Sequence, residues 1–344
     1  MSRPALPWGE VPRAEISAPS GILLVAKDTG ATSHDVVNAV RRLAATRKVG
    51  HAGTLDPLAS GLLTLGIGKS TKILRYFTNL DKSYRAQLCL GVATTTEDAA
   101  GEILSNPQPG LTPLFQAALY SPYSALAANA ALQAALAQFR GEIMQRPSAV
   151  SAIKVEGKRA YARVRAGEKI ELPARPVVIS ALEVGELRPG PIFSRAGKEI
   201  PTLVAELSLS CSSGTYVRAL ARDIGSSLGM GAHLQALERT RVGTFTLEQA
   251  ASISEYSEMV RRGLPLPVQS AEATLRTMLP ILTVSAAERT ALSYGQRISL
   301  PPDFRKENQD FAAIYGEELV ATGTVKSGKM QLHTVFITPP AARS

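Results

Sequence analysis

A short glycine-flanked segment carries one histidine and one aspartate in a setting that suits chemistry. It runs from Gly50 to Gly61 and reads GHAGTLDPLASG, with His51 near one end and Asp56 in the middle. Pro57 restricts Asp56 to extended backbone conformations, and a carboxylate presented on such a turn can act as a nucleophile or a base. The same residues also suit an ordinary turn in which the aspartate accepts backbone hydrogen bonds. The spacing does not match a phosphate-binding P-loop.

A second segment places an arginine where a strand runs directly into a helix. Residues 202–211 (TLVAELSLSC) alternate apolar and polar side chains, which predicts a half-buried antiparallel strand. The residues that follow predict a helix with Thr215 as its N-cap, and Arg218 falls in the first turn of that helix. Its apolar stripe consists of Val217, Leu220, Ile224 and Leu228.

The charge distribution points to nucleic acid as a partner. The 344 residues carry a formal net charge of +9, with 38 Lys and Arg against 29 Asp and Glu. The stretch 140–175 alone contains nine basic and four acidic residues, a net charge of +5. A concentrated basic segment can neutralise phosphates and release counterions, which is the main source of nonspecific affinity for nucleic acids.

Several classes of protein are excluded. No apolar run approaches the roughly 18 residues of a membrane span, and the first 20 residues lack the apolar core of a signal peptide. Those 20 residues are proline-rich and predict a flexible leader. Two cysteines, Cys89 and Cys211, cannot form a disulfide framework or a four-thiolate zinc site. We expect a cytoplasmic protein without a membrane segment or a metal.

The remaining pattern predicts two structural units of an α+β protein. The first contains strands at 21–27, near 61–68 and at 84–90, with helical periodicity at 36–44 and 69–77. Residues 103–139 carry no charge and predict a loop to about Ser124 followed by an alanine-rich helix ending near Phe139. The basic stretch predicts surface loops or short helices. After a linker at 263–269, short apolar runs separated by glycines predict a small β-barrel or sandwich.

The motifs of this sequence, in their order along the chain, closely resemble those of the TruB family of tRNA pseudouridine synthases. The likeness covers roughly residues 20–260 and rests on five separated segments, whose coincidence is highly specific. These segments are KDTGATSHDVV, GHAGTLDPLASG, DKSYRAQLCLG, QRPSAVSAIKVEGKRAYARVRAG and CSSGTYVRALARDIGSSLGMGAHLQALERTRVGTF.

The resemblance implies a fold and an activity. The fold is a pseudouridine synthase catalytic domain at 21–265, built on a largely antiparallel mixed sheet flanked by helices and loops. It carries an RNA-gripping insertion at about 140–175, and a small PUA-like β-barrel at 275–340 follows. The activity is the isomerisation of uridine 55 in the T-loop of tRNA to pseudouridine, which requires the base to be flipped out of its stack.

Roles for six residues follow from the resemblance alone. Asp56 is implied as the essential carboxylate, which attacks the sugar, attacks the base or removes a sugar proton. Arg218 is implied to pair with it and hold it charged and oriented. Tyr84 would lie against the flipped uracil, and His51 would fill the space that the base leaves in the T-loop. Tyr216 and Leu237 would contact the nucleotide in the pocket. The family needs no metal and no cofactor, and we expect a monomer.

Two other functions stay open. A noncatalytic factor that unfolds and refolds tRNA would share the RNA-binding features, although the Asp56, Tyr84 and Arg218 set favours catalysis. A guide-RNA-dependent enzyme acting on ribosomal RNA is disfavoured by the long basic insertion, because that branch resembles this family without such an insertion. The insertion departs from the family where Ser148 and Val150 replace a proline and a tyrosine, and the long loop 105–125 has no assigned function.

Overall fold

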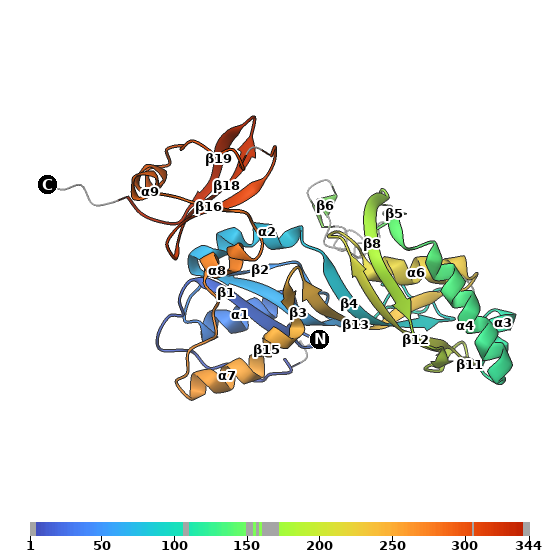
Figure 1. Ribbon diagram of the computed structural model, residues 1–344. Coiled ribbons are helices and arrows are strands. Elements are labelled where there is room, and N and C mark those ends of the chain that lie inside the picture. Colours follow the sequence, from blue (N-terminus) through green and yellow to red (C-terminus); the bar gives the residue numbers. More distant parts are fainter. Residues whose placement is uncertain are drawn as a thin grey trace.

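The computed structural model describes residues 5–105, 110–148, 154–155, 158–159, 172–304 and 306–339 (Figure 1). One large mixed sheet runs through the first and larger part of the chain, and a smaller sheet lies at its C-terminal end. Helices pack against both sheets. The α+β class predicted from the sequence is therefore confirmed.

Eleven described strands form the large sheet. Eight of them follow one another in the order β15-β1-β3-β13-β4-β12-β8-β5. In addition, β2 pairs with β3, β9 pairs with β12 and β14 pairs with β13. The neighbours β1/β15 and β3/β13 are parallel and the other pairs are antiparallel. The strands are β1 Gly21–Lys27, β2 Val49–Ala52, β3 Ala59–Ile67, β4 Lys82–Leu90, β5 Gly141–Gln145, β8 Arg175–Val184, β9 Arg188–Pro189, β12 Leu203–Cys211, β13 Ala232–Val242, β14 Phe245–Thr246 and β15 Ala251–Ser252.

The helices are α1 Ser33–Leu43, α2 Arg75–Thr78, α3 Pro113–Ala117, α4 Pro122–Ala137, α6 Val217–Ser227, α7 Ile253–Arg261, α8 Ala271–Arg276 and α9 Ala286–Ser293, with the 3-10 turns η1 Gly68–Ile73 and η2 Leu247–Gln249. Helices α1, α4 and α6 lie close to their predicted positions, whereas α3 lies in the stretch predicted as a loop and a 3-10 turn with the short α2 replaces the helix predicted at 69–77. Two short hairpins complete this part of the chain. The hairpins are β6 Lys154–Val155 with β7 Lys158–Arg159, and β10 Phe193–Arg195 with β11 Lys198–Ile200.

Alternating side chains of β1 divide the core of this half of the sheet. Leu23 and Val25 pack with α1 and α7, while Ile22 and Leu24 pack with α2 and α8. Successive residues of a strand point to opposite faces, so this strand is apolar throughout because both of its faces are covered. Thr32 caps α1 through a capping box with Asp35, and the helix begins at Ser33, before the periodicity predicted at 36–44.

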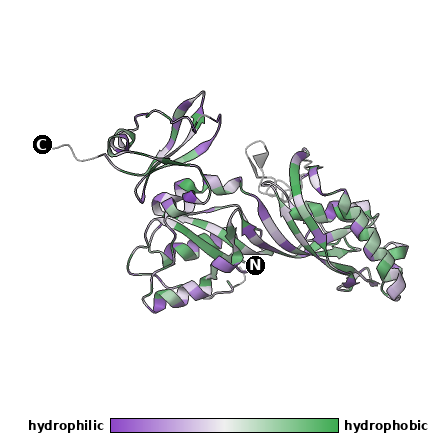
Figure 2. Cartoon of the chain, viewed as in Figure 1, coloured by the Kyte–Doolittle hydropathy of each residue, from purple (hydrophilic) through white to green (hydrophobic). Residues whose placement is uncertain are grey.

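The other half of the sheet has its own core, which α4 and α6 cover. The inward residues of β12, spaced two apart, pack with Leu220 and Ile224 of α6 and with Leu132 and Leu136 of α4. This confirms the half-buried antiparallel strand predicted at 202–211. In Figure 2 hydrophobic residues predominate along α4. This helix begins at Pro122, slightly before the predicted position, because Ser121 accepts a hydrogen bond from the Ser124 amide and caps it.

The N-terminal segment is not the flexible leader that its proline content predicts. Trp8 and Val11 are buried in the core beside α1 and α7. The Arg42 side chain donates a hydrogen bond to the Val11 carbonyl at 2.8 Å, and the Ala14 amide donates to the Arg42 carbonyl. Burial of one large aromatic side chain outweighs the local composition.

The C-terminal sheet is open, so the prediction of a closed barrel is wrong. Its order is β16-β17-β18-β19, and within the described residues no pairing joins β16 to β19. These strands are Ile281–Thr283, Asp310–Tyr315, Glu318–Lys326 and Lys329–Val335. Four strands are few for closure, and α9 packs against β18 instead. A separate core formed largely by α9 and these strands fills this unit.

The two units share a core instead of being joined by a free linker. Ile314 and Leu319 of the C-terminal sheet pack in one cluster with Ile22 of β1 and Tyr76 of α2. The predicted linker at 263–269 pairs with β1, because Gln269 and Ile22 exchange two backbone hydrogen bonds of 2.9 and 2.8 Å. This packing fixes the C-terminal sheet beside α2 and α8 (Figure 1).

The basic stretch 140–175 contains strands where we expect loops or short helices. Its first five residues after Arg140 form β5, which pairs with β8, and β8 begins at Arg175. Most of the insertion, including Val150 and Tyr161, lies outside the described residues. In the described part of the chain, no helix has the length and apolar character required to span a membrane.

Candidate active site

A cavity of about 370 Å³ lies where the sequence motifs meet. It brings together Asp56, Tyr84, Tyr216, Arg218 and Leu237, five of the six residues singled out from the sequence. The sixth, His51, does not belong to its lining. The other lining residues are Gly53, Thr54, Leu55, Ala59, Thr78, Lys82, Ser212, Gly214, Thr215, Val217 and Arg239.

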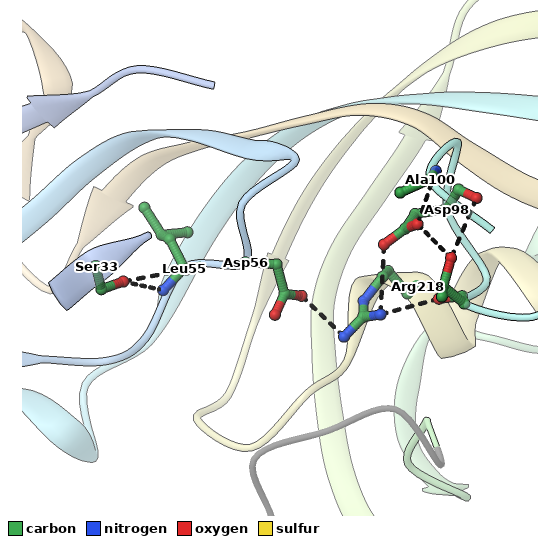
Figure 3. A network of polar contacts seen from close by, with 7 residues as sticks. Ser33, Leu55, Asp56, Asp98, Ala100 and Arg218 are labelled. Atoms are coloured by element: carbon green, nitrogen blue, oxygen red, sulfur yellow. Dashed lines mark hydrogen bonds and ion pairs between the residues drawn. The ribbon is translucent and has the colours of Figure 1, made fainter. Parts of the chain in front are cut away.

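The backbone on both sides of Asp56 is held by Ser33 at the N-terminal end of α1 and by Gly30 in the turn before this helix. The Ser33 hydroxyl accepts a hydrogen bond from the Leu55 amide at 2.9 Å and lies 3.1 Å from the Leu55 carbonyl oxygen, to which it donates (Figure 3). Beyond Asp56, the Gly30 amide donates to the Pro57 carbonyl at 2.7 Å. These contacts explain why the loop that carries Asp56 lies next to the segment KDTGATSHDVV, some 25 residues earlier in the chain.

Arg218 forms an ion pair with Asp56. Its Nη2 lies 2.9 Å from Asp56 Oδ2 (Figure 3). The arginine side chain is 7% exposed and the aspartate side chain 43% exposed, so the pair joins a buried cation to an open carboxylate. The carboxylate therefore keeps one side toward the cavity, where a substrate can reach it.

A second carboxylate, Asp98, lies behind the arginine. Asp98 Oδ2 is 3.4 Å from Arg218 Nη1, which also donates to the Thr96 carbonyl at 2.9 Å. Asp98 is itself buried and accepts hydrogen bonds from Thr96 Oγ1 and from the Ala100 amide. Asp98 is not among the residues singled out from the sequence. The available signal was the polar segment TTTED at 94–98, with three residues between it and the end of β4.

Helix α6 begins one residue later than predicted, at Val217, and its N-cap is Tyr216. Tyr216 does not cap the helix with its side chain; the buried Gln145 of β5 holds its backbone instead, accepting from the amide at 2.8 Å and donating to the carbonyl at 3.1 Å. Thr215, the predicted cap, donates its hydroxyl proton to the Ser212 carbonyl. This arrangement leaves the Tyr216 side chain at the cavity wall.

Strand register places Tyr84 and Leu237 on the cavity floor. Tyr84 of β4 lies opposite Arg239 of β13, and Leu237 of β13 lies opposite Ala59 of β3. Burial raises the pKa of the Tyr84 hydroxyl, while the charge of Arg239 opposes this increase. Tyr84 therefore stays protonated near neutral pH and can donate a hydrogen bond.

His51 lies on β2, outside the cavity. Its ring meets that of His34 edge to face with centroids 5.7 Å apart. Burial, His34 and Arg239 together lower the pKa of His51. Its Nδ1 is buried without a hydrogen-bond partner among the described residues. The ring is thus a neutral, partly apolar surface at neutral pH.

Two lysines near the cavity are also buried. Burial lowers the pKa of Lys27 and of Lys82 to about 8 each. Lys27 donates to the Ala31 carbonyl at 2.6 Å, and Lys82 donates to the Thr78 and Leu80 carbonyls at 2.8 and 2.6 Å. The sequence does not single out Lys82 and Arg239, because basic residues within strands resemble exposed positions.

The cavity is built for a reaction at a carboxylate. It combines the open carboxylate of Asp56, the buried guanidinium groups of Arg218 and Arg239, the protonated phenol of Tyr84 and the apolar side chain of Leu237. In the described ranges of the chain, no group of three or more His, Cys, Asp or Glu side chains is placed to hold a metal ion.

Two family models match most of the chain. "TruB family pseudouridylate synthase (N terminal domain)" matches residues 41–217, and "tRNA pseudouridylate synthase B C-terminal domain" matches residues 218–278. The boundary between them falls directly before Arg218, so the ion pair joins residues from both matched parts.

Curated relatives are similar over most of their length. The chain is 46% identical to tRNA pseudouridine synthase B of Arthrobacter sp. over 81% of this chain and 82% of that protein. It is 41% identical to the protein of the same name from Corynebacterium diphtheriae over 94% of this chain and 98% of that one. The Mycobacterium avium protein of that name is 49% identical over 71% of each chain.

Solved structures show the same fold at lower identity. A chain in the crystal structure of a Cbf5-Nop10-Gar1 complex superposes with a TM-score of 0.62 at 21% identity, covering 98% of this chain and 95% of that one. A chain of an H/ACA RNP bound to a substrate RNA containing 2'-deoxyuridine gives a TM-score of 0.59 at 21% identity, with 92% and 85% covered.

Proposed function

Because the chain belongs to the TruB family of pseudouridylate synthases, we propose that it converts uridine 55 in the T-loop of tRNA to pseudouridine. The curated relatives of 41–49% identity all carry the name tRNA pseudouridine synthase B. The enzyme is an isomerase that modifies RNA. The single structural observation that supports this function is the ion pair between Asp56 and Arg218 at the wall of the cavity.

The reaction moves one bond without changing the composition of the nucleotide. The glycosidic bond between N1 and C1′ breaks, the uracil turns over, and C5 bonds to C1′ while C5 loses its proton and N1 gains one. Product and substrate are isomers, so the balance requires no oxidant, reductant or cosubstrate. We therefore propose that the enzyme works without a cofactor.

Asp56 is the proposed essential carboxylate. It is the open carboxylate of the cavity, and its backbone is fixed on both sides by α1 and the segment before it. Arg218 orients it through a charge-assisted hydrogen bond. Either attack on the nucleotide or removal of a sugar proton would use the same negatively charged oxygen.

The other lining residues receive the nucleotide in this proposal. The rings of Tyr84 and Tyr216 and the side chain of Leu237 form the surface against which a flipped uracil packs. Flipping costs unstacking energy, and apolar contact with these side chains offsets part of it. The protonated Tyr84 hydroxyl can donate a hydrogen bond to the base.

His51 takes a different role because it lies outside the cavity. Its lowered pKa keeps the ring neutral, and a neutral ring can stack between bases. We propose that it fills the place that uridine 55 leaves in the T-loop. The partner is then the T-arm of tRNA, the enzyme acts as a monomer, and tRNA processing places it in the cytoplasm.

The test is conversion of a guide-free tRNA transcript by the purified protein. We expect stoichiometric pseudouridine at position 55, detected by mass spectrometry of RNase fragments, and none in a transcript with cytidine at that position. A protein that refolds tRNA but forms no product would be a folding factor. Product that appears only after a guide RNA is added would instead assign the guide-dependent activity.

A further inference from the structure

Arg239 is among the largest fully buried side chains of the described chain. It is 2% exposed and yet contributes to the lining of the cavity that contains Asp56. A buried arginine must satisfy its donors, because each unpaired buried donor is costly. The acceptors of its hydrogen bonds therefore show which parts of the chain the Arg239 side chain holds in place.

The guanidinium of Arg239 connects the two ends of the Asp56 loop. Nη2 donates to the carbonyl of Gly53 at 3.0 Å, and Nε donates to the carbonyl of Leu62 at 2.8 Å. Gly53 directly precedes the segment 54–61 and Leu62 directly follows it. One rigid, planar group thus fixes the distance between the points where the catalytic segment begins and ends.

The backbone of Arg239 adds a second attachment. Arg239 pairs with Gly61 of β3 on one side and with Tyr84 of β4 on the other. Gly61 has a φ of +100°, and a Cβ there would lie 2.3 Å from the Arg239 carbonyl oxygen, so the two backbones touch closely. A register shift between Arg239 and Arg241 occurs at this point of the strand, as is common beside active sites.

We propose that Arg239 is a positioning residue for the isomerisation, and that its guanidinium sets the position of Asp56 relative to Tyr84 by joining Gly53 to Leu62. This inference rests on the proposed function. It assigns Arg239 a different task from Arg218, because Arg218 contacts the Asp56 carboxylate itself while Arg239 holds the loop that carries it.

Arg239→Lys tests the proposal, because lysine keeps the charge but cannot reach two carbonyls with a fixed fork. The measurement is the single-turnover rate constant per bound tRNA, together with the tRNA Kd from filter binding. Normalising to bound tRNA makes the rate constant independent of any unfolded fraction. We expect a rate constant lower by about 100-fold, the effect of a displacement of about 1 Å, with Kd changed by less than about threefold.

Arg241→Lys is the matched control. Arg241 lies two residues away on β13, donates to Ser83 Oγ and to the Gly243 carbonyl, and does not line the cavity. It should keep the wild-type rate constant. Gly53→Ala approaches the same clamp from the loop side, because Gly53 has a φ of +77°, where an alanine is strained, and its Cβ would contact Arg239 Nη1 at 3.4 Å. We expect it to lower the rate constant as well.

Two outcomes overturn the proposal. A wild-type rate constant in Arg239→Lys would show that the bridge between the carbonyls is not needed, and a loss confined to Kd would make Arg239 an RNA-binding residue. Wild-type protein assayed in parallel separates this failure from that of the proposed function, since an inactive wild-type protein would refute the function itself.

Discussion

Asp98 Oδ2 lies 3.4 Å from Arg218 Nη1, so the arginine that holds Asp56 is itself held by a second, buried carboxylate (Figure 3). The other oxygen of Asp98 accepts from Thr96 and from the Ala100 amide. Asp98 thereby holds the guanidinium of Arg218 on the buried side of its ion pair with Asp56. The order of contacts is Asp98 to Arg218 to Asp56, from the core to the cavity.

Asp98→Asn should lower the rate constant by roughly 100-fold with little change in tRNA Kd. If the amide oxygen keeps the contacts with Thr96 and Ala100, its NH₂ group faces the Arg218 donors and repels them. Glu97→Gln is the control, because Glu97 pairs with Arg222 at 2.6 Å and does not contact Arg218. Single-turnover assays of both variants test this prediction. Equal rate constants for Asp98→Asn and Glu97→Gln would show that the contact between Asp98 and Arg218 does not affect the reaction.

Lys82 should make folding stability depend on pH. Its pKa is about 8 in the folded protein and 10.5 when unperturbed, because burial disfavours the charged form. Between these pH values the unfolded chain binds more protons, so the lysine's contribution to the free energy of unfolding increases with pH and is lost as pH falls through 8. The lowered pKa of Lys82 changes the free energy of unfolding by about 3 kcal/mol in total, because each pKa unit corresponds to about 1.36 kcal/mol.

Urea unfolding of wild type and Lys82→Met at pH 7.5 and pH 10 measures this contribution. The free energy of unfolding of wild type minus that of the variant should be larger at pH 10 than at pH 7.5. Comparing the two proteins cancels the opposite effect of Cys89, whose pKa burial raises to about 11. An equal difference at both pH values would mean that the buried lysine stays charged.

The C-terminal sheet should unfold together with the catalytic part. Ile314 is 1% exposed and packs in one cluster with Ile22 and Tyr76. Ile314→Ala should therefore lower the free energy of unfolding by about 2–5 kcal/mol in a single transition followed by calorimetry. Gln331→Ala, at an exposed position of β19, should change it by less than about 0.5 kcal/mol. Two resolved transitions, of which only one shifts, would show independent units.

Local patterns predict the elements of this fold better than they predict its contacts. The strand at 202–211 and the helix around 36–44 are visible because alternation and helical spacing are short-range signals. Asp98 and Arg239 are not, since Asp98 lies 120 residues from Arg218 along the chain and Arg239 lies 186 residues from Gly53. Such pairings depend on strand register across the sheet, which one sequence does not specify.

The same limit explains two of the errors of fold. Trp8 is buried through contacts with helices that follow it in the chain, and its proline-rich neighbours conceal this. The C-terminal strands have the spacing of a barrel, but closure depends on how the strand edges meet. Motif likeness carries such long-range information, because it groups Asp56, Tyr84 and Arg218, which lie far apart in the chain and line one cavity.

The basic insertion should dominate the salt dependence of tRNA binding. We expect log Kd to rise linearly with log salt concentration, and neutralising Lys154, Lys158, Arg159 and Arg163 to glutamine should reduce that slope by up to about 0.7–0.9 per lost phosphate contact. The control neutralises four exposed basic residues on other surfaces: Arg13, Lys198, Arg262 and Lys306. Equal slopes for wild type and the insertion variant would show that the insertion does not touch phosphate.

Asp56→Asn should separate binding from catalysis. Asparagine preserves the shape and part of the hydrogen bonding of the aspartate but removes the charge that nucleophilic or basic action requires. Because the side chain is 43% exposed at the cavity wall, the change should not unfold the protein. We expect tRNA binding within about threefold of wild type and no detectable pseudouridine in a single-turnover assay with excess enzyme.

Asp81→Asn is the control for that substitution, because Asp81 is exposed at the start of β4 and lies outside the cavity lining. It should form product at the wild-type rate. Asp56→Asn protein verified by mass spectrometry that still forms pseudouridine at a near-normal rate would refute the role of this carboxylate. The ion pair with Arg218 would then serve only to join the loop to helix α6, and the reaction would have to begin at another group of the cavity.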